Sequence, residues 1–229
     1  RRYWGQFRAE EIDATEIDEV NNRLVASVGT CSVMGTASTM ACIAEALGMT
    51  VPGGASPPAV TADRMRVAEA TGAQAVEMAK TGLTIDKILT PAAFKNAMRV
   101  LLAIGGSTNG IVHLAAIAGR MGMTVDLADL DEMGRNTPVL VDLKPSGAHY
   151  MEHFHAAGGM ATLLRELKPL LALDALTVTG RTLGEEIDLA GPSFQQDVIR
   201  PMDKPIYPQG GIAHLTGNLA PGGAIIKQS

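Results

Sequence analysis

The sequence predicts a mostly helical α/β chain. Two observations carry this expectation. Apolar residues recur at helical spacing over much of the first 120 residues and again within residues 149–172, apart from two adjacent glycines. Short apolar runs at residues 138–143 and 176–180 are typical of buried strands. The 229-residue chain is 46% hydrophobic and 19% charged, so it holds enough apolar side chain for a folded core.

The first predicted helices lie within residues 1–27 and 36–47. In the first stretch, the residues that we expect to face a core are Ile17, Val20, Leu24 and Val25. The second stretch places its apolar residues at i, i+3, i+4 and i+7, and Gly48 suits its end. Residues 51–58 hold three prolines and two glycines, so they are expected to form a long turn.

Three further helices have recognisable starts. Thr61 is a good N-cap for a helix over residues 61–80. Pro91 follows Thr90 and suits the first position of the next helix. Another helix is predicted after the glycine-rich stretch at residues 105–110. Residues 190–211 carry four prolines and are expected to be loops, and a turn-and-strand pattern begins at Ile212.

Charge and composition exclude several classes of protein. The net charge is −5 and aromatic residues make up 3%, which argues against a basic nucleic-acid binder that stacks bases. No apolar stretch reaches the roughly 18 residues of a membrane span. Two cysteines are too few for a disulfide scaffold, so we expect a cytoplasmic protein. Because the chain lacks an initial Met and ends in an apparent new strand, we expect an interior piece of a longer protein.

Cys31 is the first candidate for chemistry. It lies in a loop bracketed by Gly29 and Gly35, just before a predicted helix whose N-terminus favours a thiolate. Such a thiolate could serve as a nucleophile or as a ligand for a soft metal. The alternative is a small buried cysteine in a tight turn. Cys42 lies within the helix, and we expect it in the core.

A second glycine-rich loop separates two apolar helices. Its glycines let the backbone approach a ligand, and the following helix offers free N–H groups to an anion. The alternative is an ordinary helix–helix turn, because the pattern is neither a P-loop nor a dinucleotide fingerprint. The candidate residues are Gly105, Gly106, Ser107, Thr108 and Asn109.

The histidines give weaker signals. His153 and His155 lie two residues apart on a predicted helix, so they point to different faces and do not share one metal ion. We expect both at the surface or an interface. We expect His113, one turn after Asn109, to be a packed histidine.

Read together, the motifs resemble the dihydroxy-acid and sugar-acid dehydratase family. They cover nearly the whole chain in order: Gly29–Ala41, Glu45–Gly48, Pro52–Gly53, Ile104–Asn109, Leu143–Gly147, Ala157–Gly159, Val178–Leu183 and Gly217–Pro221. The resemblance implies a helix-rich part of an N-terminal α/β domain at residues 1–190. Residues 191–229 would then connect to, and begin, a C-terminal β-rich, barrel-like domain.

The resemblance also implies a hydro-lyase. Such enzymes remove water from a 2,3-dihydroxy carboxylic acid, and the enol product becomes a 2-keto-3-deoxy acid. An iron-sulfur cluster (2Fe-2S, with 4Fe-4S as the alternative) held by three cysteines acts as a Lewis acid, and Mg2+ binds the carboxylate end. Cys31 matches the third cluster cysteine. The other two cysteines and the acidic metal ligands are expected upstream, and a serine base is expected downstream. The loop Gly105–Asn109 is expected to frame the pocket.

The residues around Cys31 also bear on the substrate. Gly35 and Ser38 stand where the branched-chain amino-acid enzyme tends to have an aromatic residue and Asn, which favours an aldonic or related sugar acid. The 2,3-dihydroxy-3-methyl acid of branched-chain biosynthesis is the alternative. We expect the 229-residue chain alone to be inactive and the full-length protein to be a homodimer or homotetramer.

Two hypotheses from other functional classes remain as alternatives. In one, the chain is a non-catalytic truncated homologue that acts as a binding subunit, with its Met-rich helices as the interface. In the other, it is a cysteine-nucleophile hydrolase, which needs a His and a carboxylate near Cys31 that nothing local supplies.

Overall fold

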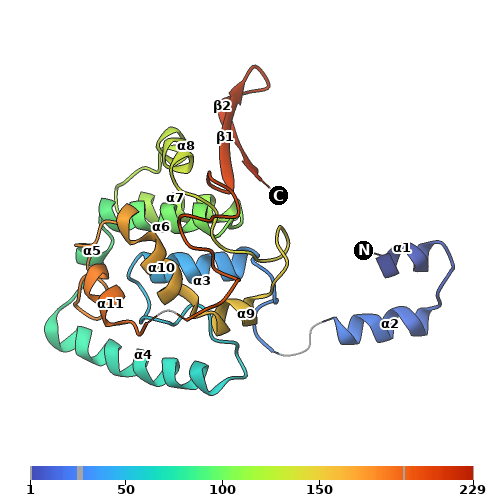
Figure 1. Cartoon of the computed structure of the whole chain (residues 1–229), viewed down its shortest axis with the longest axis horizontal. Coiled ribbons are helices and arrows are strands. Elements are labelled where there is room, and N and C mark those ends of the chain that lie inside the picture. Colours follow the sequence, from blue (N-terminus) through green and yellow to red (C-terminus); the bar gives the residue numbers. More distant parts are fainter. Residues whose placement is uncertain (1, 25–27, 193, 229) are drawn as a thin grey trace.

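Helices dominate the described part of the structure, and a hairpin of two strands follows them (Figure 1). The computed structural model describes residues 2–24, 28–192 and 194–228. In chain order its elements are α1 (Arg2–Arg8), α2 (Ala14–Arg23), α3 (Thr36–Ala46), α4 (Ala62–Thr81), α5 (Ile85–Ile88), α6 (Pro91–Ala103), α7 (Asn109–Arg120), α8 (Leu127–Arg135), α9 (Met151–Ala156), α10 (Gly159–Leu167), the 3-10 turn Lys168–Leu170, α11 (Leu183–Leu189), β1 (Ile212–Gly217) and β2 (Ala220–Lys227). The predicted mixed α/β class is confirmed.

The structure confirms the predicted helix starts at Thr61 and Thr90. The Thr61 side chain accepts a hydrogen bond from the Arg64 N–H at 3.4 Å and caps α4. Thr90 caps α6 in the same way, and Pro91 occupies its first turn. None of the helices in the described part of the chain is long and apolar enough to cross a membrane.

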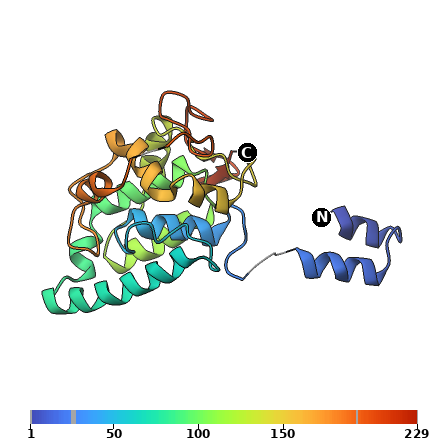
Figure 2. The same ribbon diagram turned by 60° about the horizontal axis from the view of Figure 1, so that its bottom comes forward.

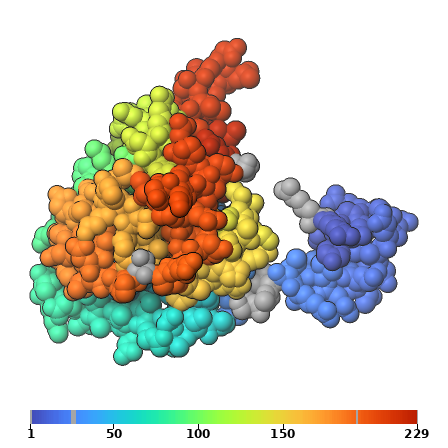
Figure 3. Space-filling view, viewed as in Figure 1, coloured from blue at the N-terminus to red at the C-terminus, as the bar shows by residue number. Residues whose placement is uncertain are grey.

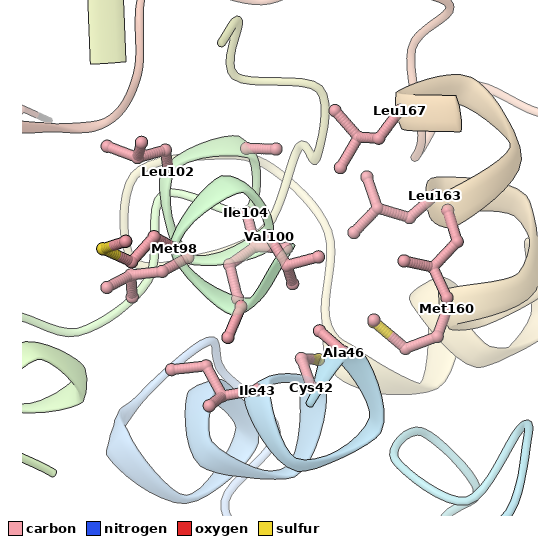
Figure 4. Packing of buried hydrophobic residues seen from close by; sticks show 14 of the residues in the cluster. Cys42, Ile43, Ala46, Met98, Val100, Leu102, Ile104, Met160, Leu163 and Leu167 are labelled. Atoms are coloured by element: carbon pink, nitrogen blue, oxygen red, sulfur yellow. The ribbon is translucent and has the colours of Figure 1, made fainter. Parts of the chain in front are cut away.

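The core is built between α3, α6 and α10 (Figure 4). All three helices turn an apolar face inward, and their buried residues include Cys42, Ile43, Ala46, Val100, Leu102, Met160, Leu163 and Leu167. Cys42 is fully buried, which confirms the expectation that it belongs to the core. This packing fixes the N-terminal end of α3, where the Cys31 loop enters the helix.

The hairpin of β1 and β2 projects from the body beside α8 (Figure 1). The strands pair antiparallel, with Ile212 opposite Lys227 and Leu215 opposite Ala224. The Asp131 carboxylate on α8 accepts a hydrogen bond from the His214 N–H at 3.1 Å, which ties the hairpin to the helices. The turn-and-strand pattern predicted from Ile212 onward is confirmed.

The prediction of two buried strands is wrong, because neither apolar run forms a continuous strand. Residues 138–143 are extended and largely buried, but they form isolated bridges, such as Val139 with Tyr207 and Val141 with Ile199. Residues 176–180 form one bridge, between Leu176 and Thr182. The first run finds its partners in a proline-rich segment, and proline lacks the N–H that a continuous ladder requires.

The expectation that the N-terminal stretch faces a core is only partly met. Helices α1 and α2 contact each other, and Figures 1 and 2 show them lying apart from the other elements. The space-filling view in Figure 3 shows the same separation. Ile17 is 3% exposed, but Leu24 is 68% exposed. Val25 lies outside the described residues. The helical spacing therefore predicts the helix correctly, while its apolar face is largely unpacked in this chain.

Gly48, which follows α3 closely, has no room for a side chain. Its φ is +76°, and a Cβ there would lie 2.6 Å from the Leu176 carbonyl oxygen. We expect Gly48→Ala to lower the free energy of unfolding by about 1–3 kcal/mol. Gly72 on α4 has nothing within 4 Å of its Cβ position, so Gly72→Ala should raise that free energy by about 0.5–1 kcal/mol. Urea unfolding measures both, and equal effects would contradict the packing described here.

Candidate functional site

Cys31 lines a cavity of about 320 Å³ on the α3 side of the body. Two loops form most of its wall, residues 28–32 and 54–59. The thiol of Cys31 is exposed, whereas the Ser38 side chain on α3 is buried at 3% exposure. Arg64 at the start of α4 and Glu152 in the first turn of α9 complete the polar lining. The cavity therefore offers an accessible sulfur among small residues.

The loop that carries Cys31 is held on both sides by backbone hydrogen bonds. The Met34 N–H donates to the Lys144 carbonyl and the Met151 N–H donates to the Ser32 carbonyl, both at 2.8 Å. A Cβ on Gly35, the N-cap of α3, would lie 3.7 Å from the Cys31 sulfur. The sulfur thus lies beside a helix N-terminus, as the sequence predicts, and that end of a helix favours an anion.

The second loop of the cavity is anchored by a buried carboxylate. Glu45 on α3 is 6% exposed, and it accepts the Gly53 N–H at 2.7 Å and the Ala55 N–H at 2.9 Å. Burial raises the pKa of this carboxyl group to about 7, against the lowering effect of the two hydrogen bonds. Arg64 donates to the Gly54 carbonyl at 3.0 Å and fastens the other side of the loop.

The candidate loop Gly105–Asn109 lies beside the start of α3 but does not line this cavity. The Ser107 N–H donates to the Thr39 hydroxyl at 2.9 Å, and the Ser107 and Thr36 hydroxyls are 3.1 Å apart. Asn109 donates to the Thr36 hydroxyl at 3.0 Å. The two glycine-rich loops singled out in the sequence are therefore joined through threonines of one helix.

His153 and His155 have different hydrogen-bond partners. His153 accepts a hydrogen bond from the Tyr150 N–H at 3.1 Å, whereas His155 contacts Ser56 and Asp63. The prediction that His153 and His155 do not converge is confirmed. The prediction of a packed His113 is wrong, because α7 buries Ile111 and leaves His113 exposed on another face.

Sequence reasoning missed Glu45, Ser56 and Arg64 as parts of the site. Residues 51–58 are predicted as a long turn, and the sequence alone does not show what that turn lies against. A signal was present in Glu45, an acidic residue in a helix otherwise made of small and apolar residues. Such a residue indicates a specific hydrogen-bonding role, since a buried carboxylate needs partners.

The described residues supply one soft donor for a metal cluster. Cys31 is accessible, but Cys42 is buried in the core, and burial raises the pKa of its thiol. No group of three or more His, Cys, Asp or Glu side chains within residues 2–24, 28–192 and 194–228 is arranged to hold a metal ion. Cys31 is thus the accessible cysteine that the described residues offer to such a cluster. The described residues do not fit a magnesium site.

The described residues form a helix-rich body with an accessible cysteine at the wall of a cavity. Family models give its class. The model for the dihydroxy-acid/6-phosphogluconate dehydratase N-terminal domain matches residues 1–186, and that for the C-terminal domain matches residues 197–229. The chain belongs to the dihydroxy-acid/6-phosphogluconate dehydratase family.

Relatives of two kinds align with the chain. It is 41% identical over 228 residues to a dihydroxy-acid dehydratase of Methanosarcina barkeri, covering 98% of this chain and 41% of that protein. A dihydroxy-acid dehydratase of Nitratidesulfovibrio vulgaris strain Hildenborough is 42% identical over 228 residues, with the same coverage. An L-arabonate dehydratase of Azospirillum brasilense is 50% identical over 192 residues, covering 82% of this chain and 33% of that protein. The chain thus spans less than half the length of these relatives.

Proposed function

We propose that the polypeptide containing this chain is a dehydratase that removes water from a 2,3-dihydroxy carboxylic acid. The observation that carries the proposal is the accessible Cys31 thiol beside the N-terminus of α3, at the wall of a 320 Å³ cavity. Membership of the dehydratase family supports it. The chain supplies one accessible cysteine, so the 229-residue piece alone is expected to be inactive.

Cys31 is proposed as one ligand of an iron-sulfur cluster. When bound, such a cluster supplies a Lewis acid for the departing hydroxyl group. The chain's own contribution is positional. The loop before α3 is held by two backbone hydrogen bonds, in which the Met34 N–H donates to the Lys144 carbonyl and the Met151 N–H donates to the Ser32 carbonyl. A ligand held on a fixed loop loses little conformational entropy when the metal binds.

The rest of the proposal concerns the complete polypeptide. In it, residues 1–190 are the latter part of the N-terminal domain, and residues 191–229 are the connection and the first strands of a C-terminal β-rich domain. It also includes a homodimer or homotetramer, a Mg2+ ion held mostly by residues outside this chain, and a pocket framed in part by the loop Gly105–Asn109. That loop does not line the Cys31 cavity, but it hydrogen-bonds Thr36 and Thr39 of the helix that follows Cys31, which supports its placement beside the site.

We propose a sugar acid as the substrate. The identity of 50% with the L-arabonate dehydratase, against 41–42% with the two dihydroxy-acid dehydratases named above, supports this choice. A branched 2,3-dihydroxy-3-methyl acid is the second candidate. It is favoured by the longer alignment with the dihydroxy-acid dehydratases, which covers 98% of the chain.

A substrate panel tests the proposal. The complete polypeptide, purified without oxygen, should release 2-keto-3-deoxy acids from five- or six-carbon aldonates. The expected kcat/KM for the best aldonate is at least about tenfold higher than for 2,3-dihydroxy-3-methylbutanoate, since pocket contacts set such ratios. Colorimetric detection of the keto acid measures both. The reverse preference would establish the second candidate, and release from neither class would contradict a dehydratase.

A further inference from the structure

Three side chains from separate elements form a hydrogen-bonded chain at the wall of the Cys31 cavity. The Ser56 hydroxyl lies 3.2 Å from Nδ1 of His155 on α9. Nε2 of the same imidazole lies 3.0 Å from the Asp63 carboxylate in the first turn of α4. Ser56 lines the cavity and is 7% exposed, whereas the Asp63 side chain is 46% exposed. The chain of contacts therefore runs from the cavity to the solvent.

The charge of Asp63 fixes the direction of its hydrogen bond with His155. The hydrogen bonds of Asp63, first with Arg66 and then with His155, hold the pKa of its carboxyl group below the usual range. An ionised Asp63 accepts the Nε2–H, so Nδ1 faces the Ser56 hydroxyl group. Nδ1 accepts a hydrogen bond from this hydroxyl in the neutral imidazole and donates one to its oxygen in the imidazolium. This is the arrangement in which a carboxylate orients an imidazole toward a hydroxyl group.

Neighbouring charged groups have other partners. Arg64 on α4 donates to the carbonyls of Gly54 and Pro57. On α9, Glu152 lies 3.8 Å from His153. In the described part of the chain, the hydrogen-bond partners of the His155 imidazole are therefore Ser56 and Asp63. When the imidazole takes up a proton, the carboxylate of Asp63 stabilises the resulting cation.

We propose that Ser56, His155 and Asp63 form a proton relay that delivers a proton into the Cys31 cavity when water is eliminated. The inference rests on the proposed dehydratase function and adds an acid to it. The hydroxyl group leaves the substrate carbon with the bonding electron pair and takes the Ser56 proton to become water. His155 enters the step as the imidazolium and donates its Nδ1 proton to the Ser56 oxygen as that oxygen gives up its own proton. The resulting neutral imidazole, 26% exposed, regains a proton from solvent.

Ser56 is the group that faces the reacting molecule, and His155 and Asp63 are positioning residues that act through it. A hydrolase of the serine type is not favoured by the same contacts. The backbone N–H groups of Gly53 and Ala55, which precede Ser56 in the loop, both donate to Glu45. They are therefore not free to stabilise an oxyanion, which acyl transfer requires.

Kinetics of the complete polypeptide test the relay. His155→Gln should lower kcat by about 10²- to 10⁴-fold and remove the alkaline limb of the kcat–pH profile, with KM changed less than about threefold. Ser56→Ala should give a similar loss, and Asp63→Asn should also lower kcat, because it removes the carboxylate that orients the imidazole. Added imidazole should restore part of the activity of His155→Ala. His113→Gln, which changes an exposed histidine on α7, is the matched control and should behave as wild type.

Nuclear magnetic resonance of ¹⁵N-histidine in the same holoprotein gives a readout independent of turnover. The neutral imidazole of His155 should carry its proton on Nε2, and Asp63→Asn should reduce the share of that tautomer. A proton on Nδ1 of the neutral imidazole, or an unchanged tautomer ratio in Asp63→Asn, would overturn the relay. Wild-type activity with an unaltered pH profile in His155→Gln would also overturn it, while leaving the dehydratase function intact. An inactive wild type would instead contradict the proposed function, and the resonance experiment would still decide whether the relay exists.

Discussion

Replacing Cys31 with serine is expected to remove iron and sulfide from the complete polypeptide and to lower its turnover by more than about 100-fold. Even changes outside the ligand shell typically cost about 10- to 100-fold in metal affinity or activity. A serine hydroxyl has nearly the shape of the thiol, but it is not ionised near neutral pH and lacks the soft sulfur that iron-sulfur clusters require. Iron and sulfide assays of the anaerobically purified variant measure the loss.

Cys42 provides the matched control for this prediction. It lies in the core between α3 and α6, where its thiol is fully buried. Cys42→Ala should lower the free energy of unfolding by about 1 kcal/mol through lost packing. It should leave the ratio of iron to polypeptide unchanged. Normal iron and sulfide in Cys31→Ser would contradict the assignment of Cys31 as a ligand.

The helices that the sequence predicts best are those whose start signals are local. Thr61 and Thr90 cap the helices that follow them, and an N-cap acts on residues two or three positions away. The run at residues 138–143 shows the limit of such reasoning. Its apolar character predicts burial correctly. Whether it forms a ladder depends on a proline-rich segment much later in the chain, as the bridge between Val139 and Tyr207 shows.

In the candidate site, too, the features that are local in the sequence could be predicted and the contacts between distant residues could not. Cys31 could be found because its glycine brackets and the following helix are contiguous in the sequence. The contact between Ser56 and His155 joins residues 99 positions apart, and the contact between Thr36 and Ser107 joins residues 71 positions apart. Periodicity and composition carry no information on such pairings. The second of them depends on the packing of α3 against α6 and α7, which brings the two glycine-rich loops together.

Glu45 should make the stability of the protein fall as pH rises from 4.5 toward 7. Burial raises the pKa of its carboxyl group from 4.5 to about 7 in the folded state. The folded state therefore binds the proton more tightly than the unfolded state. The resulting stabilisation is fully present below pH 4.5 and is lost as pH rises through about 7, and the loss amounts to about 3 kcal/mol.

Glu45→Gln isolates this contribution, because the amide has nearly the same volume and does not titrate. The difference in unfolding free energy between wild type and variant should change by about 3 kcal/mol between pH 4.5 and pH 8. Groups such as Asp131, whose pKa is lowered by hydrogen bonds from Arg135 and His214, act with the opposite sign below pH 4. They are common to both proteins and cancel in the difference.

Hydrogen exchange tests whether Glu45 holds the loop of residues 53–55 in the cavity wall. In wild type the Gly53 and Ala55 N–H groups are protected by the two Glu45 oxygens. The side-chain amide introduced by Glu45→Gln has one oxygen in place of two, so one of these N–H groups loses its acceptor, at a cost of about 1–3 kcal/mol. Exchange at residues 53–55 should therefore accelerate by about 10- to 100-fold in the variant, while exchange within α6 stays unchanged. Equal protection of the loop in both proteins would show that Glu45 does not hold it, and a flat pH difference would show that its carboxyl group is not the titrating one.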